Sequence, residues 1–159
     1  MFKGVRTVIN STLCYLEADD SYLMLHRIKK KNDMNHDKWI GVGGKLEAGE
    51  SPEECVKREV LEETGLSVID PVFRGILYFF NTEYETEFIY VFSSDRFEGS
   101  LKECDEGVLE WVPKKDMLSL PVWEGDKIFL DVLMNTGRFF SLKLEYAGDK
   151  LIRHDLHLY

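Results

Sequence analysis

The feature that most constrains this 159-residue chain is a glycine-rich loop followed at once by a short, acidic helical segment. Ser51 stands where a helix N-cap belongs, with Pro52 at the first helical position and Glu54 at the third. Serine and glutamate at this spacing form a capping box, and proline fits the first turn because its missing N–H needs no partner there. Gly65 suits the left-handed conformation that ends a helix. The pattern therefore predicts a helix from Pro52 to the residue before Gly65.

Three glutamates, Glu59, Glu62 and Glu63, stand at positions i, i+3 and i+4 of this predicted helix. They fall within about 100° of arc, with Cβ atoms about 5–6 Å apart. Two interpretations are open at this point: a solvated acidic face, or a site for a hard divalent cation, which prefers carboxylate and carbonyl oxygens. Gly43 and Gly44 permit close approach of the backbone to a ligand, so a carbonyl there is a candidate for the same site.

Length, composition and charge exclude several classes of protein. Hydrophobic residues make up 44% of the chain, enough for the core of one domain spanning residues 1–159. We find no apolar run long enough to cross a membrane and no secretory leader pattern. The net charge of −9 argues against a nucleic-acid polymer as partner, although a bound cation reverses the local sign for a small polyanion. Three cysteines without CxxC spacing (Cys14, Cys55 and Cys104) favour a reducing, cytoplasmic location.

The remainder of the chain alternates predicted strands with one further helix. Apolar, β-rich segments predict strands over 5–17, 21–28, 67–80, 86–93 and 108–112. We expect a second helix over about 124–135, and a final hairpin that turns at Ala147-Gly148-Asp149. Strands mixed with two helices predict an α+β fold with a mixed sheet between helices.

Nine positions across residues 44–66 fit the pattern G-x5-E-x7-R-E-U-x-E-E-x-G-U, where U is a bulky aliphatic residue. They are Gly44, Glu50, Arg58, Glu59, Val60, Glu62, Glu63, Gly65 and Leu66. A chance match in a chain of this length is on the order of one in ten million. The pattern is the Nudix box, and the chain resembles the Nudix hydrolases. The resemblance implies an α/β/α sandwich with a mixed sheet, and it favours the metal site over the solvated face.

Nudix hydrolases cleave a nucleoside diphosphate linked to another moiety, using Mg²⁺ or Mn²⁺ and an attacking water molecule. By resemblance, the metal ligands are Glu59, Glu62, Glu63 and the Gly43 carbonyl. Glu59 is the first choice for the group that deprotonates the water. Arg58 lies beside these acids, either as an ion-pair partner that orients them or with a direct catalytic role.

A further acid is implied by the MutT-like branch of the family. Glu106 lies in KECDEGVLEWVP, ahead of a predicted strand. In that branch, an acid at the corresponding place completes the metal site, so Glu106 is the fifth metal-ligand candidate and the second choice for the base. Glu103 and Asp105 are rivals for the same role.

The segments that flank the box resemble the MutT-like branch that hydrolyses oxidised purine nucleoside triphosphates. They are LMLHRIKK, KWIGVGGKLEAGE, EGVLEWVP and LPVWEGDKIFLDVL. By resemblance, Trp123 stacks on the base and Asp126 hydrogen-bonds to a purine edge. Taken from the pattern alone, Trp123 is equally well a core aromatic. Further substrate-binding candidates are Thr12, Arg27, Gly44 and Lys45.

One departure from that branch concerns the base. Ile40 follows Trp39 where one member carries an asparagine that contacts the base, so base preference is open. We expect a Mg²⁺-dependent nucleoside triphosphate pyrophosphohydrolase, monomeric or homodimeric, that converts 8-oxo-dGTP to 8-oxo-dGMP and pyrophosphate in nucleotide-pool sanitation. The alternatives are a Nudix hydrolase of ADP-ribose or an ordinary dNTP, and a non-catalytic nucleotide-sensing module, which the intact set of glutamates disfavours.

Overall fold

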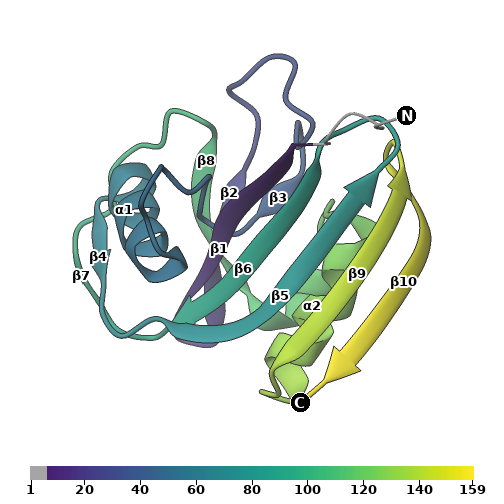
Figure 1. Ribbon diagram of the computed structural model, residues 1–159. Coiled ribbons are helices and arrows are strands. Elements are labelled where there is room, and N and C mark those ends of the chain that lie inside the picture. The colour runs from purple at the N-terminus through teal and green to yellow at the C-terminus, as the bar shows by residue number, and fades with distance from the viewer. Residues whose placement is uncertain (1–6) are drawn as a thin grey trace.

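A computed structural model describes residues 7–159, which contain ten strands, two α-helices and one 3-10 helix (Figure 1). In chain order they are β1 (Val8–Ala18), β2 (Ser21–His26), β3 (Trp39–Ile40), α1 (Pro52–Thr64), β4 (Leu66–Val68), β5 (Val72–Asn81), β6 (Thr86–Ser94), β7 (Phe97–Gly99), β8 (Val108–Pro113), the 3-10 helix η1 (Lys114–Ser119), α2 (Glu124–Asn135), β9 (Phe140–Ala147) and β10 (Lys150–Leu158). Both predicted helices and the final hairpin are confirmed. Residues 5 and 6 of the first predicted strand lie outside the described residues.

The local signals at α1 act as the sequence predicts. Ser51 Oγ accepts from the Glu54 amide at 3.1 Å, and Glu54 Oε2 accepts from the Ser51 amide at 3.4 Å, which completes the capping box. Gly65 ends the helix with φ of 79°, a left-handed conformation that a residue with a Cβ adopts only at a cost. The start and the end of α1 are therefore fixed by three residues within the segment or directly beside it.

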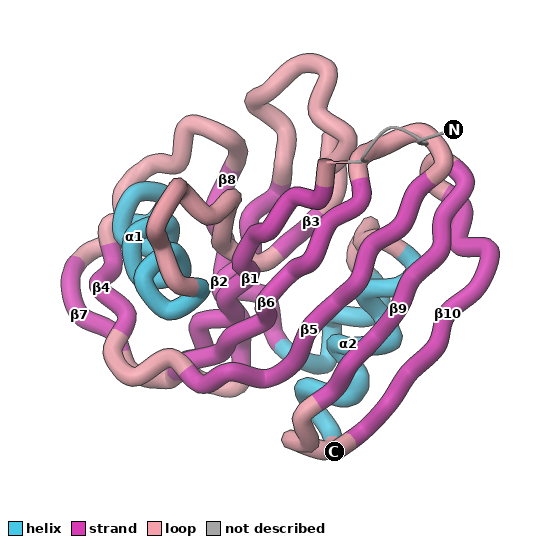
Figure 2. Tube along the Cα trace, viewed as in Figure 1, coloured by secondary structure: helices cyan, strands magenta, loops and turns pink. Residues whose placement is uncertain are grey.

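Eight of the ten strands form one mixed sheet in the order β10-β9-β5-β6-β1-β2-β3, with β8 paired to β2 (Figure 2). β1 pairs with β6 and β5 pairs with β9 in parallel, whereas the other pairs in the sheet are antiparallel. β1 and β2 pair only at Glu17–Ala18 with Ser21–Tyr22. Along the rest of β1, the segment 42–46 takes the place of β2, with isolated bridges to the strand. The glycine-rich loop is thereby held against the sheet.

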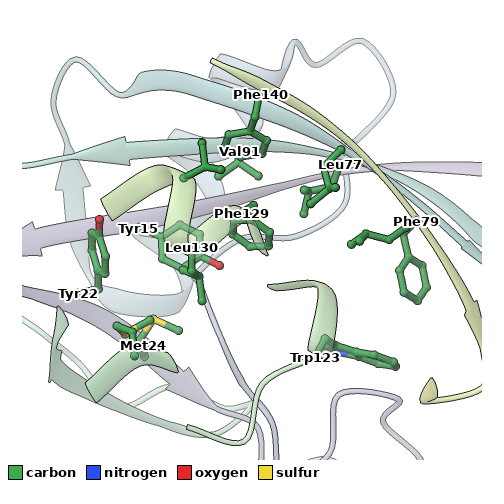
Figure 3. Close-up of a cluster of buried hydrophobic side chains, with 14 of the residues drawn as sticks. Tyr15, Tyr22, Met24, Leu77, Phe79, Val91, Trp123, Phe129, Leu130 and Phe140 are labelled. Carbon is green, nitrogen blue, oxygen red and sulfur yellow. The ribbon is translucent and has the colours of Figure 1, made fainter. Parts of the chain in front are cut away.

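The two helices cover opposite faces of the sheet, so the predicted sandwich is confirmed (Figure 1). Neighbouring residues of β1 point to opposite faces, as the pleat of a strand requires. Leu16 packs with Val56 and Val60 of α1 in one core cluster. Tyr15 packs with Phe129 of α2 in the other, with ring centroids 5.9 Å apart (Figure 3).

The structure differs from the expectation of one strand over 67–80. β4 ends at Val68 and pairs with β7 in a separate two-stranded sheet, while β5 starts at Val72 in the main sheet. Asp70 between them has a φ of 46°, and Pro71 has no N–H to donate, so the strand breaks there. β3 and β7 have two and three residues, too few to show an alternating pattern in the sequence.

Candidate active site

The glycine-rich loop lies between β1 and α1, with almost no space around it. The Thr12 amide donates to the Gly44 carbonyl at 2.9 Å. A Cβ at Gly43 would lie 1.8 Å from the Thr12 carbonyl oxygen, and one at Gly44 would lie 2.5 Å from the carboxyl carbon of Glu59. Only glycine fits at position 43, because the clash there is with the backbone of β1, whereas a side chain at position 44 would displace the Glu59 carboxylate.

Glu63 is the most buried acid of α1, with 9% of its surface exposed. Its Oε2 accepts from the Gly43 amide at 3.1 Å, which joins the helix to the loop. The pKa of Glu63 is raised strongly, first by burial and then by the nearby charge of Glu106. Burial also raises the pKa of Glu59, against the opposing effect of Arg58. For both Glu59 and Glu63, the protein's own cations do not fully offset the cost of burying the negative charge.

Arg58 connects the acids of the helix with the loop before it. Its Nε and Nη2 donate to the two carboxylate oxygens of Glu50 at 2.6 and 2.9 Å, and its Nη1 donates to Glu59 Oε1 at 2.7 Å and Glu62 Oε2 at 3.1 Å. Its Nη2 also donates to the Lys45 carbonyl at 3.1 Å. The hydrogen bond from Arg58 lowers the pKa of Glu50 to about 2. Of the two sequence-based interpretations of Arg58, this geometry matches the orienting ion-pair partner.

Glu106 faces the acidic helix from the segment before β8. It is hydrogen-bonded to Arg27 Nη1 and accepts from Lys30 Nζ at 2.7 Å. Burial alone raises the pKa of Glu106, but Lys30 and Arg27 outweigh it and the net shift is downward. The rival acids Glu103 and Asp105 are exposed.

A single cleft of about 1160 Å³ contains nearly all the residues that the sequence singles out. It is lined by Thr12, Arg27, Gly43, Gly44, Lys45, Arg58, Glu59, Glu63, Glu106, Trp123 and Asp126, and of the predicted site residues only Glu62 is absent from the lining. The Glu62 side chain is 58% exposed, on the outer side of Arg58. Thr12 lies beneath the glycine-rich loop, where its hydroxyl is 3.4 Å from Cys55 Sγ.

The donor set at the acidic end of the cleft fits a hard divalent cation. Glu59, Glu63 and Glu106 supply carboxylate oxygens. Burial raises the pKa of the first two, so a cation bound there would stabilise their charged forms. Within residues 7–159, no three His, Cys, Asp or Glu side chains converge on one ready-made metal position. Arg58 is hydrogen-bonded to Glu59, and Arg27 and Lys30 are hydrogen-bonded to Glu106. These contacts keep the carboxylates apart from one another.

The other end of the cleft is aromatic and centres on Trp123, which is 6% exposed. Phe79 and Tyr146 meet its ring edge to face, with centroids 5.6 and 5.1 Å away. Its indole N–H donates to Asn35 Oδ1 at 2.7 Å, and Lys38 Nζ lies 4.2 Å from the ring centroid. Trp123 is therefore both a packed residue and part of the cleft lining.

The NUDIX domain family matches residues 9–133 of the chain. The chain belongs to this family. An uncharacterised Nudix hydrolase, YvcI of Bacillus subtilis (strain 168), is 34% identical over 128 residues, 77% of either chain. An oxidised purine nucleoside triphosphate hydrolase of Danio rerio is 30% identical over 129 residues, 80% of this chain and 82% of that protein. The crystal structure of a MutT protein from Bacillus halodurans superposes with a TM-score of 0.82 at 32% identity, covering 93% of this chain and 97% of that one.

These matches confirm the resemblance that the box and its flanks indicated, and they confirm the mixed α+β fold of the MutT-like neighbours. The family comprises hydrolases of phosphorus anhydrides in nucleotide substrates. In the described part of this Nudix chain, no helix has the length and apolar character to cross a membrane.

Asn35 is a cleft residue that sequence reasoning missed. It lies in the polar loop between β2 and β3, where its backbone N–H donates to Asp33 Oδ1 at 3.0 Å. Asp33 Oδ2 in turn accepts from Arg27 Nε at 2.7 Å. Polar loops contain many asparagines, and no local pattern distinguishes this one, because its partner Trp123 is 88 residues away.

Asp126 lies in the first turn of α2 and is 9% exposed. Burial raises its pKa to about 7, and Lys38 opposes that shift only in part. Near neutral pH the carboxyl group is therefore present in both protonation states, as an acceptor and as a donor of hydrogen bonds.

The raised pKa of Asp126 predicts a stability that falls as pH rises. The folded pKa of about 7 exceeds the unfolded value near 3.9, so the stabilising contribution is complete below that lower value and is lost as pH rises through 7. Between pH 5 and 8 we expect wild type to lose about 2–3 kcal/mol of unfolding free energy relative to Asp126→Asn. Urea denaturation of both proteins at the two pH values measures this difference, and parallel pH profiles would contradict the assignment.

Proposed function

We propose that this Nudix protein is a divalent-metal-dependent pyrophosphohydrolase that converts an oxidised purine nucleoside triphosphate, such as 8-oxo-dGTP, to the monophosphate and pyrophosphate. The observation that carries the proposal is one cleft with an acidic, phosphate-handling end and an aromatic end lined by Trp123 and Asp126. The relatives named oxidised purine nucleoside triphosphate hydrolase, from Danio rerio and Mus musculus, are 30% and 31% identical to this chain and support it.

At the acidic end, the proposed metal ligands are the carboxylates of Glu59, Glu62, Glu63 and Glu106 and the carbonyl of Gly43. Mg²⁺ or Mn²⁺ held by these residues would neutralise phosphate charge and lower the pKa of the attacking water. This role for a cation accords with a chain whose net charge of −9 would otherwise repel a triphosphate.

The chain's own residues orient the phosphates and accept the proton. Arg58 binds Glu59 through Oε1, which leaves Oε2 as the oxygen that takes the proton from the attacking water. The water oxygen bonds to the α- or the β-phosphorus, and the anhydride P–O bond between these two phosphorus atoms breaks. The leaving group, pyrophosphate in the first case and the nucleoside monophosphate in the second, carries away the bond electrons. Lys45 and Arg27 line the cleft beside these acids and supply positive charge to the phosphate chain.

At the aromatic end, Trp123 is the stacking surface for the purine. Its packing against Phe79 and Tyr146 fixes the ring before a base arrives, which limits the entropy lost on binding. Because the indole N–H is only a donor, it holds the Asn35 amide with oxygen toward Trp123. The amide donors of Asn35 and the carboxyl group of Asp126 then provide polar contacts that Ile40 cannot.

A substrate panel with a tryptophan variant tests this function. In the presence of Mg²⁺, we expect kcat/KM for 8-oxo-dGTP to exceed that for dGTP, ADP-ribose and dinucleoside polyphosphates at least tenfold. Trp123→Ala should weaken nucleotide binding by about 1–3 kcal/mol because one stacking surface is lost. The matched control is Trp111→Ala, since Trp111 packs on Phe97 and is not part of the cleft lining.

Three outcomes of this panel separate the functions. ADP-ribose as the best substrate would replace the triphosphate proposal with that of a sugar-nucleotide hydrolase. Nucleotide binding without turnover of any substrate would favour the sensing module. Equal losses of affinity in Trp123→Ala and Trp111→Ala, at matched melting temperature, would remove Trp123 from the base site.

We also propose a cytosolic location and a role in cleansing the nucleotide pool, which limits mutation of DNA. Three buried cysteines, none in a disulfide within residues 7–159, support a reducing compartment. A tagged copy of the full chain, followed by cell fractionation, tests the location.

A further inference from the structure

One half-buried acid of the cleft has no role in the chemistry described above. Glu87 lies on β6, between its register partners Ile9 on β1 and Phe79 on β5, so it sits in the interior of the sheet rather than at an edge. Its side chain lines the cleft and Oε1 accepts from Ser11 Oγ at 2.5 Å. Burial raises its pKa, while Ser11 and Lys45 lower it in part. A carboxyl group in this position costs folding free energy that an apolar side chain would not.

The pair formed by Glu87 and Ser11 lies between the two ends of the cleft. On the phosphate side, Ser11 forms an isolated β-bridge with Lys45 of the glycine-rich loop. On the other side, the next residues on the same face of the two parallel strands are Leu13 and Ile89. Both pack against the core cluster that contains Trp123. A nucleotide has the same order of parts, with its sugar between the phosphates and the base.

The hydrogen-bonding sites that remain available on Glu87 and Ser11 are acceptor sites. An ionised carboxylate has about four lone-pair sites, and the Ser11 hydroxyl occupies one of them on Oε1. Among the described residues, Oε2 of Glu87 receives no hydrogen bond. Ser11 Oγ, whose proton points to Glu87, is left with its own lone pairs. Adjacent sugar hydroxyls are donors that suit two such neighbouring acceptors.

We propose that Glu87 and Ser11 form a sugar-recognition site that accepts hydrogen bonds from the 2′- and 3′-hydroxyls of a ribonucleotide. The proposal rests on the proposed function and deepens it, since it makes the ribonucleoside triphosphate a better substrate than its deoxy counterpart. A deoxyribose offers only the 3′-hydroxyl and leaves one of the two acceptors without a partner. A site that lacks this pairing with the deoxy substrate discriminates against it.

The test compares 8-oxo-GTP with 8-oxo-dGTP in wild type, Glu87→Gln and Ser11→Ala. We expect a ribo-to-deoxy ratio of kcat/KM of about ten in wild type, falling to within about twofold of one in either variant. Glutamine keeps the size of the side chain but loses the charge and places an N–H₂ donor where hydroxyl protons arrive. Glu110→Gln is the matched control, because Glu110 is an exposed glutamate on β8 that is not part of the cleft lining, and its ratio should stay that of wild type.

A second readout separates this proposal from the proposed function. Calorimetry with the monophosphates 8-oxo-GMP and 8-oxo-dGMP reports sugar preference without turnover, so it remains informative if neither triphosphate is hydrolysed. A wild-type ratio of one or below, in both kcat/KM and Kd, would overturn the sugar site while leaving the hydrolase intact. A preference for ribose that persists in folded Glu87→Gln and Ser11→Ala would assign it to other residues.

Discussion

Replacing Glu63 with glutamine is expected to lower kcat at least 100-fold while the protein stays folded. The variant removes a negative charge from the proposed metal site but keeps the size of the side chain, so the loss should lie in kcat rather than in substrate affinity. Without metal, the melting temperature should rise slightly, because glutamine avoids the cost of burying an ionisable acid beside Glu106. We expect Glu62→Gln to lower kcat to a similar extent.

Thermal melting with and without Mg²⁺ gives this prediction an independent readout. At a metal concentration about 100 times its dissociation constant, binding adds about 2.7 kcal/mol to the stability of wild type, and Glu63→Gln should lose most of this gain. Glu53→Gln, an exposed change in the first turn of the same helix, should behave as wild type in both assays. Near-normal turnover of Glu63→Gln at saturating Mg²⁺ would refute the metal assignment.

Arg58→Ala is expected to lower kcat at least 30-fold, with KM for the nucleotide changed less than threefold. The guanidinium holds Glu59, Glu62 and the segment that carries Glu50 in one arrangement, and loss of that orientation affects the chemical step more than ground-state binding. Arg58 is a positioning residue in this account, since its contacts are with the acids.

Arg58→Lys separates orientation from charge. Lysine keeps the positive charge but cannot reproduce the paired hydrogen bonds to both oxygens of Glu50, so we expect it to recover little of the lost kcat. A lysine variant with wild-type kcat would show that charge alone is sufficient. An alanine variant that raises KM without lowering kcat would instead place Arg58 against the substrate.

The parts of the molecule that the sequence predicts correctly are those determined locally. Ser51, Glu54 and Gly65 fix α1 through contacts within a few residues, and the nine-position pattern extends over the same segment. The cleft residues found by resemblance, such as Trp123 and Asp126, also lie within recognisable segments.

The parts that sequence reasoning misses depend on contacts between distant segments. Asn35 gains its place in the cleft from Trp123, and Ser11 gains its place from Glu87, 76 residues away. β7 is too short for a pattern, and its pairing with β4 decides that the predicted strand over 67–80 divides. None of these features can be recognised before the three-dimensional arrangement of the chain is known.

The two parallel strand pairs have a consequence for how the protein reaches its native state. β1 pairs with β6 and β5 pairs with β9 through residues more than 60 positions apart in the chain, so both pairings require closure of a long loop before they contribute stability. β9 also supplies Tyr146, whose hydroxyl accepts from the Gly125 amide at the start of α2. During synthesis, the walls of the cleft therefore come together only after β9 has left the ribosome. Until then α1 can form, but the cleft that its glutamates line is incomplete.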